Sequence, residues 1–116
     1  MLRLMIVDDE QIIREALSSM IDYTSLGYEV IATAKNGMEA YDRIRDDYPD
    51  VVITDIKMPI LNGLELIERA SRIDSRITFI LLSGYGEFEY AKQAMKYGVR
   101  YYLLKPTDKQ ELINCL

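Results

Sequence analysis

Histidine and tryptophan are absent from the 116 residues of this chain, which has one cysteine and three prolines. Without histidine the chain has no Ser-His or Cys-His nucleophile pair, no histidine zinc site and no phosphohistidine of its own. Cys115 has no second cysteine with which to form a disulfide, which fits a reducing cytoplasm and gives no sign of a cysteine metal site. Any chemistry must therefore come from carboxylates, hydroxyls and lysines.

Long apolar runs and an excess of positive charge are also missing. No segment resembles a secretory signal or a membrane span. The net charge is −5, from 14 basic and 19 acidic residues, so the chain lacks the basic surface of a nucleic-acid binder, and any contact with DNA would need another domain. A chain of this length fits one domain whose core needs no metal or disulfide.

Five apolar segments are predicted to be strands: Leu2–Val7, Tyr28–Ala34, the run that starts at Val51 and delivers Asp55 to a loop closed by Pro59, Ile77–Leu82 and Tyr101–Leu104. Apolar residues at helical spacing follow each strand: Ile12, Ile13, Ala16, Leu17, Met20 and Ile21; then Ala40, Tyr41, Ile44 and Tyr48; then Leu64, Ile67 and Ala70; then Phe88, Ala91, Ala94 and Met95; and last Leu112, Ile113 and Leu116. We expect the last helix to be cut short at Leu116 and the natural protein to continue.

Strand and helix thus alternate five times, and three of the strands are continuously apolar. This pattern is typical of a parallel sheet with helices on both faces. The predicted fold class is α/β, a doubly wound, flavodoxin-like five-stranded parallel sheet, (βα)5, in the order 2-1-3-4-5. Its crevice should lie between the first and third strands, at their carboxyl ends.

Polar residues stand at these carboxyl ends: Asp8, Asp9 and Glu10 after the first strand, Asp55 after the third, Ser83 after the fourth and Lys105 after the fifth. Each has a simpler explanation when taken singly. The three acids could cap the first helix, which is worth about 0.3 to 1 kcal/mol, but one acid would suffice for that. Asp55 and Ser83 could be turn residues, and Lys105 a solvated cation. Because all of them are expected at the same crevice, a functional site explains them better together.

Carboxylates that meet in one crevice repel each other by roughly 4 kcal/mol per pair at 4 Å and an effective dielectric near 20. Lys105 supplies one compensating charge, and a hard divalent cation with oxygen ligands would supply the rest. Mg²⁺ is favoured, with Mn²⁺ possible, whereas zinc and iron are disfavoured without histidine or a cysteine pair. In this setting Asp55 could act as a nucleophile toward phosphorus and form an aspartyl phosphate, with Ser83 donating a hydrogen bond to the phosphoryl group.

The sequence resembles the receiver domain of two-component response regulators over essentially its whole length, residues 1–116. The motifs that carry the resemblance are VDDE at Val7–Glu10, TDIKMP around Asp55, Asn62-Gly63, Ser83-Gly84, Tyr102 and Lys105-Pro106. The resemblance implies that Asp55 is the phosphoacceptor and Asp9 a direct Mg²⁺ ligand. Asp8 would be a metal-shell acid that acts through water, and Lys57 a ligand through its backbone carbonyl.

The resemblance also implies a switch. Ser83 and Tyr102 would form the switch pair, Lys105 would contact the phosphate, and the Lys105-Pro106 bond would be cis. A sensor histidine kinase would donate the phosphoryl group to this regulatory, non-enzymatic domain. The altered face of the fourth helix, fifth strand and fifth helix would then drive homodimerisation and control an output domain, absent from this chain, that binds DNA and regulates transcription.

The run from Ser83 to Pro106 further resembles receivers attached to AraC-type DNA-binding domains. Phe88 and Tyr90 within it are either ordinary core and rim residues or part of a dimer face. Three features qualify the resemblance: serine replaces the threonine common in the family at Ser83, Lys57 and Tyr85 occupy the positions that flank the reacting phosphate in the family, and Thr107 stands where an aromatic residue is common.

Two other classes of protein compete with this interpretation. A haloacid dehalogenase-type phosphatase would need an Asp-x-Asp motif after the first strand, where this chain has three consecutive acids. A phosphorylation-independent interaction module would have the same fold and is harder to exclude. A flavodoxin-like cofactor binder is disfavoured because three acids repel phosphate and no glycine-rich phosphate loop occurs.

Overall fold

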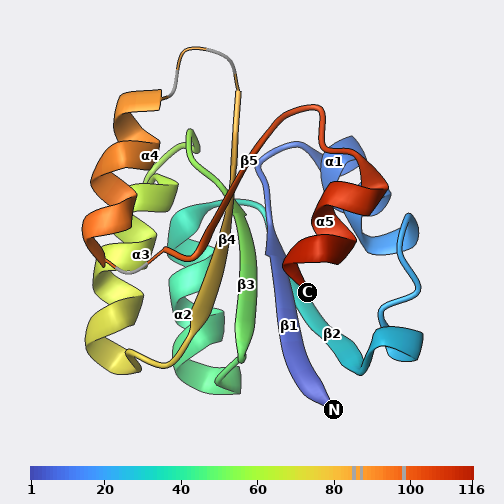
Figure 1. Ribbon diagram of the computed structural model, residues 1–116. Helices are drawn as coiled ribbons and strands as arrows, with labels where there is room; N and C mark the ends of the chain where they lie inside the picture. Colours follow the sequence, from blue (N-terminus) through green and yellow to red (C-terminus); the bar gives the residue numbers. More distant parts are fainter. Residues whose placement is uncertain (85, 87, 98) are drawn as a thin grey trace.

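The computed structural model describes residues 1–84, 86, 88–97 and 99–116 and contains one parallel sheet (Figure 1). Its strands are β1 Leu2–Val7, β2 Tyr28–Ala34, β3 Val51–Asp55, β4 Thr78–Ser83 and β5 Tyr101–Leu104. They follow the order β2-β1-β3-β4-β5, and every neighbouring pair is parallel. The predicted fold class and strand order are therefore confirmed, with β4 displaced by one residue from its expected bounds.

Helices cover both faces of the sheet. They are α1 Gln11–Ser19, α2 Gly37–Asp47, α3 Gly63–Ile73, α4 Phe88–Ala94 and α5 Lys109–Cys115. In Figure 1, α1 and α5 lie on one face, and α2, α3 and α4 lie on the other. None of the helices in the described residues is long and apolar enough to cross a membrane.

The strands supply two hydrophobic cores, one on each face. Met5 and Val7 of β1 point into the core under α2, α3 and α4, whereas Leu4 and Ile6 point into the core under α1 and α5. All four are fully buried, because successive side chains of a strand alternate between faces and both faces are covered here. This two-sided burial explains the continuously apolar strands and gives the loops at their carboxyl ends a rigid base.

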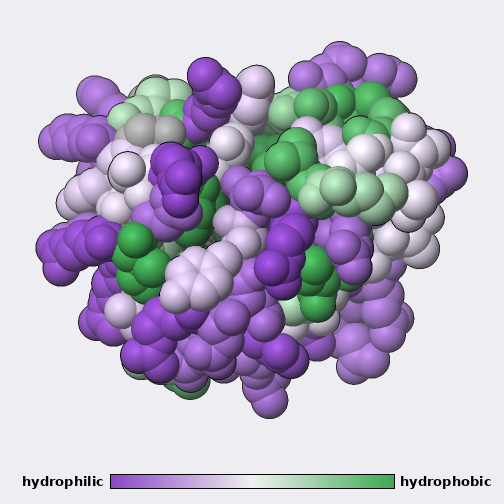
Figure 2. Space-filling view, turned by 90° about the horizontal axis from the view of Figure 1, so that it is seen from below, coloured by the Kyte–Doolittle hydropathy of each residue, from purple (hydrophilic) through white to green (hydrophobic). Residues whose placement is uncertain are grey.

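The edge of the sheet at which the strands begin lies opposite these loops and differs from the predicted site in its surface. Figure 2 shows the molecule from below relative to Figure 1, and hydrophilic side chains cover most of this view. Hydrophobic side chains appear there as separate areas rather than as one continuous face. The convergent polar residues predicted from the sequence lie at the other edge, where β1, β3, β4 and β5 end.

Four expected inward-facing residues are exposed instead. Ile12 is 77% exposed because it lies about 140° around α1 from the buried Leu17, and Ala16 shares its outer face. Tyr48 is 62% exposed because α2 ends before it and its φ is +49°. Met95 is 57% exposed because α4 ends at the preceding residue. The side chain of Phe88 lies outside the described part of the structure.

Candidate functional site

Asp55 ends β3 and is 5% exposed. The backbone amide of Ile56 donates to its Oδ1 at 2.8 Å, and the Lys105 ammonium lies 3.1 Å from its Oδ2. A charged group buried this deeply is stable only with such partners. The strand thus fixes the carboxylate, and the two contacts fix its orientation.

Lys105 connects two carboxylates that come from different strands. Its Nζ donates to Oδ2 of Asp8 at 2.9 Å and also lies beside Asp55. The Lys105 amide donates to the Ser83 carbonyl at 2.8 Å, which holds the end of β5 against β4. The peptide bond between Lys105 and Pro106 is cis, as the resemblance implied. The lysine is therefore part of the site rather than a solvated surface charge.

The protonation of these groups reflects burial and mutual charge. Burial raises the pKa of Asp55 from 3.8 to about 6, although the charge and hydrogen bond of Lys105 act in the opposite direction. Burial alone would lower the pKa of Lys105, but its contacts with Asp8 and Asp55 outweigh this and raise it. Lys105 therefore stays charged, and one lysine does not fully compensate the carboxylate of Asp55.

Three carboxylates form one group at this edge of the sheet. Oxygen atoms of Asp8, Asp9 and Asp55 all lie within 4.8 Å of one another. Asp8 is fully buried and Asp9 is exposed, so the group opens to solvent on one side. These donors are all oxygen atoms, which suits a hard cation such as Mg²⁺ and does not suit zinc or iron. The site thus fits the cation that the sequence predicts.

The acids after β1 do not serve as helix caps. Glu10 occupies the N-cap position of α1, but its side chain makes no capping hydrogen bond, and no acid stands in the first turn. The Asp8 carboxylate accepts the Glu10 amide at 3.0 Å through Oδ1, which leaves Oδ2 for Lys105. The capping explanation is therefore wrong, and of the three acids Asp8 and Asp9 belong to the site.

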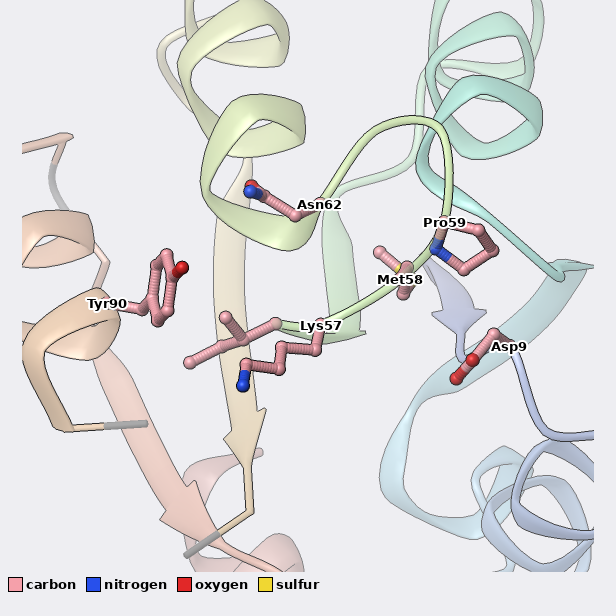
Figure 3. A pocket seen from close by; sticks show the side chains of 7 residues that line it. Asp9, Lys57, Met58, Pro59, Asn62 and Tyr90 are labelled. Atoms are coloured by element: carbon pink, nitrogen blue, oxygen red, sulfur yellow. The ribbon is translucent and has the colours of Figure 1, made fainter. Parts of the chain in front are cut away.

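A pocket of about 400 Å³ adjoins the carboxylates (Figure 3). It is lined by Asp9, Ile56, Lys57, Met58, Pro59, Asn62 and Tyr90. In Figure 3, Asp9 lies on one side and Tyr90 of α4 on the other, with the chain from Lys57 to Pro59 between them. Lys57 is thus placed at the site, while a metal-binding role for its carbonyl stays a prediction. Tyr85, the other expected flanking residue, lies outside the described residues.

Ser83 and Tyr102 are in direct contact. The fully buried Ser83 hydroxyl donates to the Tyr102 hydroxyl at 2.7 Å, and the Tyr102 ring packs against the core under α2, α3 and α4. Ser83 directly follows Leu82, which pairs with Asp55 across the sheet. The predicted switch pair is therefore connected by one hydrogen bond that joins the site to the α4 side of the molecule.

Two contributors were not expected from the sequence. Arg14 was not among the site residues predicted from the sequence, yet its Nη1 donates to the Asp8 carbonyl at 2.7 Å. Tyr90, interpreted as a core, rim or dimer residue, is 39% exposed and lines the pocket with Lys57. Both contacts depend on how helices pack at the sheet edge. No sequence pattern relates Arg14 to Asp8, which lies six residues before it.

Comparison with known proteins decides the family. Residues 4–116 match the family model described as "Response regulator receiver domain". The chain belongs to this family. It is a receiver domain, which accepts a phosphoryl group in two-component signalling and has a regulatory, non-enzymatic role. Membership implies a histidine kinase as a partner, and it sets aside the phosphatase alternative.

Relatives and solved structures agree with this assignment. The chain is 50% identical over 116 residues to "Uncharacterized transcriptional regulatory protein YesN" of Bacillus subtilis, covering all of this chain and 32% of YesN. The receiver domain of AraT, a response regulator from Geobacillus stearothermophilus, gives a TM-score of 0.94 at 39% identity, covering 98% of this chain and 88% of that one. A two-component transcriptional regulator AraC from Clostridium phytofermentans gives a TM-score of 0.93 at 34% identity, covering 100% of this chain and 90% of that one. The chain spans less than half the length of the curated relatives that it matches.

Proposed function

We propose that Asp55 is the phosphoacceptor of this receiver domain. The observation that carries this proposal is the position of its carboxylate. It is buried at the end of β3, lies 3.1 Å from the Lys105 ammonium, and shares a group with Asp8 and Asp9. A nucleophilic carboxylate, a fixed cation and additional oxygen donors are the parts needed for phosphoryl transfer to an acid.

In the proposed step, an oxygen of the Asp55 carboxylate attacks the phosphorus of a phosphohistidine on the sensor kinase. The new O–P bond forms as the P–N bond breaks, and the imidazole keeps the electron pair and takes up a proton. The Ile56 amide holds Oδ1 during this step and prevents rotation of the carboxylate. Most of the assistance comes from positioning and charge, as is usual for phosphoryl transfer.

Asp9 would ligate Mg²⁺ directly, Asp8 through water, Asp55 through a carboxylate oxygen and Lys57 through its carbonyl; Mn²⁺ could use the same oxygen donors. Once bound, the cation supplies the positive charge that offsets the phosphoryl oxygens. Lys105 is already between Asp8 and Asp55, so it can move its hydrogen bond from a carboxylate to a phosphoryl oxygen without unfolding any element.

The Ser83–Tyr102 hydrogen bond is the proposed route to the surface. A phosphoryl oxygen on Asp55 competes with the Tyr102 hydroxyl for the Ser83 hydroxyl, which shifts the population of Tyr102 between two packings. The face that responds carries exposed Tyr90, Tyr97 and Leu104. Apolar side chains of this kind suit contact with a second copy, so phosphorylation would favour a homodimer.

The remaining proposals concern the whole protein. The relatives named as transcriptional regulators are longer than this chain, which supports a receiver domain joined to an AraC-type output domain that binds DNA and regulates transcription. The acidic net charge of −5 supports DNA contact through that domain rather than through this one. Cytoplasmic location is proposed because a kinase of two-component signalling must reach Asp55.

The test is incubation of the chain with acetyl phosphate and Mg²⁺, followed by intact mass spectrometry. We expect one added phosphoryl group, and none in Asp55→Asn or without the metal. An adduct that persists in Asp55→Asn would overturn the proposal. Failure of acetyl phosphate and of a phosphorylated sensor kinase alike would favour the phosphorylation-independent interaction module. Continuous release of phosphate from small esters would instead indicate a phosphatase.

A further inference from the structure

The loop between β3 and α3, residues 56–62, is held in a costly backbone conformation. Ile60 has a φ of +72°, a value that a β-branched residue rarely adopts. The Leu61 amide donates to the Pro59 carbonyl at 2.8 Å and closes a tight three-residue turn around Ile60. Strain of this kind persists only where the surrounding structure enforces it. The contacts that enforce it should therefore be visible around the loop.

Two glycines make these contacts. At the base of the loop, a Cβ on Gly63 would lie 2.2 Å from the Asp55 carbonyl oxygen, and the Gly63 amide donates to the Ile56 carbonyl at 2.6 Å. At the outer side, a Cβ on Gly37 would lie 2.1 Å from the Leu61 carbonyl oxygen. Neither position leaves room for a methyl group beside the backbone. The loop is thus pressed between its own base and α2.

Gly37 is the more informative of the two, because it belongs to a different element. It opens α2, and the Asn36 side chain caps that helix by accepting the Glu39 amide at 2.8 Å. Leu61, the residue against Gly37, is 2% exposed, so the loop cannot move outward on that side without displacing buried groups. In Figure 3 the loop that carries Lys57 and Met58 arches between α3 and the teal ribbon of α2.

We infer that Gly37 is a positioning residue for the metal site. This role rests on the proposed function, in which the Lys57 carbonyl is a ligand. Through the contact of Gly37 with Leu61, α2 sets where that carbonyl lies relative to Asp9 and Asp55. A methyl group at Gly37 would push Leu61 away and allow the turn at Ile60 to relax. The other ligands stay fixed by β1 and β3, so the donors would no longer converge.

The test compares Gly37→Ala with Gly27→Ala. Gly27 has a φ of +87° and open space around its Cβ position, so its substitution strains the backbone far from the loop. Both variants should be less stable. Only Gly37→Ala should weaken Mg²⁺ binding, by about tenfold or more in Kd, the usual effect of losing a residue that supports a metal ligand. Calorimetry or amide NMR titration with Mg²⁺ measures this without any phosphorylation.

A second pair of variants tests the same role if Gly37→Ala does not fold. Leu61→Ala removes the buried side chain that anchors the residue facing Gly37, and Leu66→Ala removes an equally buried leucine from α3 outside the loop. Leu61→Ala should raise the Kd for Mg²⁺ several-fold more than Leu66→Ala, and should shift the metal-free amide signals of the loop.

The results distinguish a failure of the proposed function from a failure of the positioning role of Gly37. If the wild-type chain binds no Mg²⁺, the proposed function fails. If it binds Mg²⁺ and both Gly37→Ala and Leu61→Ala match their controls within twofold, the proposed function stands and the positioning role of Gly37 is wrong.

Discussion

Replacing Asp55 by asparagine should stabilise the metal-free domain at neutral pH. Asparagine has nearly the shape of aspartate but lacks the negative charge that this 5% exposed side chain buries. Burial raises the pKa of Asp55 to about 6 despite the nearby Lys105. The ionised carboxylate therefore opposes folding, as expected of a residue placed for its chemistry rather than for stability.

The size of the effect follows from proton binding in the two states. Below about pH 4 the carboxyl is protonated in both the folded and the unfolded chain, so it contributes nothing. Between about pH 4 and 6 the unfolded chain loses its proton first, and rising pH favours unfolding. Above this window both states are ionised, and the difference of about two in pKa corresponds to about 3 kcal/mol.

Urea denaturation in EDTA, at pH 4.5 and pH 7.5, measures this difference. Asp55→Asn should exceed the wild type by about 1 kcal/mol at the lower pH, where the difference has only begun to develop, and by up to about 3 kcal/mol at the higher pH. Asp46→Asn, an exposed change on α2, is the control, and its gain in stability at pH 7.5 should be well below that of Asp55→Asn because it removes no buried charge. If Asp55→Asn is no more stable than the wild type at pH 7.5, or is more stable by the same amount at both pH values, this reasoning about Asp55 is refuted.

Three further substitutions test separate parts of the site. Ser83→Ala should leave phosphorylation possible and weaken phosphorylation-linked dimerisation, measured by light scattering with acetyl phosphate, because the hydrogen bond to Tyr102 is lost; unchanged dimerisation counts against the switch. Lys105→Met should lower the rate of phosphorylation and shift Mg²⁺ binding to lower concentration, since the cation then meets less competition from the ammonium; equal rates would remove Lys105 from the mechanism. Arg14→Ala should cost about 1 to 3 kcal/mol in urea denaturation, because the Asp8 carbonyl loses its charged donor. Arg72→Ala, which breaks only an exposed ion pair, should cost less than about 1 kcal/mol, and equal losses would contradict this role of Arg14.

The arrangement of the sheet could be predicted because it depends on simple sequence patterns. Continuous apolar strands require cover on both faces, and alternation with helices then leaves few possible topologies. Individual side chains were harder to place. Ile12 is as hydrophobic as its neighbour Ile13, and only the angle at which α1 lies on the sheet decides that Ile12 faces outward. Tyr48 was misplaced for a similar reason, since its exposure depends on where α2 ends.

The convergence of Asp8, Asp9, Asp55 and Lys105 was also predictable, because parallel strands bring their carboxyl ends to one edge. The distances between these side chains and the protonation of Asp55 could not be predicted, since both depend on how deeply the groups are buried. The contribution of Arg14 and the close approach of Gly37 to Leu61 join segments that no local pattern relates. Glycine in an Asn-Gly pair indicates a turn to any reader of the sequence, and only the structure shows what fills the space of its missing side chain.

The most direct test of the central claim is to locate the phosphoryl group itself. Treating the phosphorylated wild-type chain with borohydride reduces an aspartyl phosphate to homoserine, and peptide mass spectrometry then identifies the altered residue. Our proposal predicts homoserine at position 55 alone, dependent on Mg²⁺ and on the phosphoryl donor. Homoserine at position 8 or 9, or a phosphoryl group on Ser83 that resists the treatment, would contradict it.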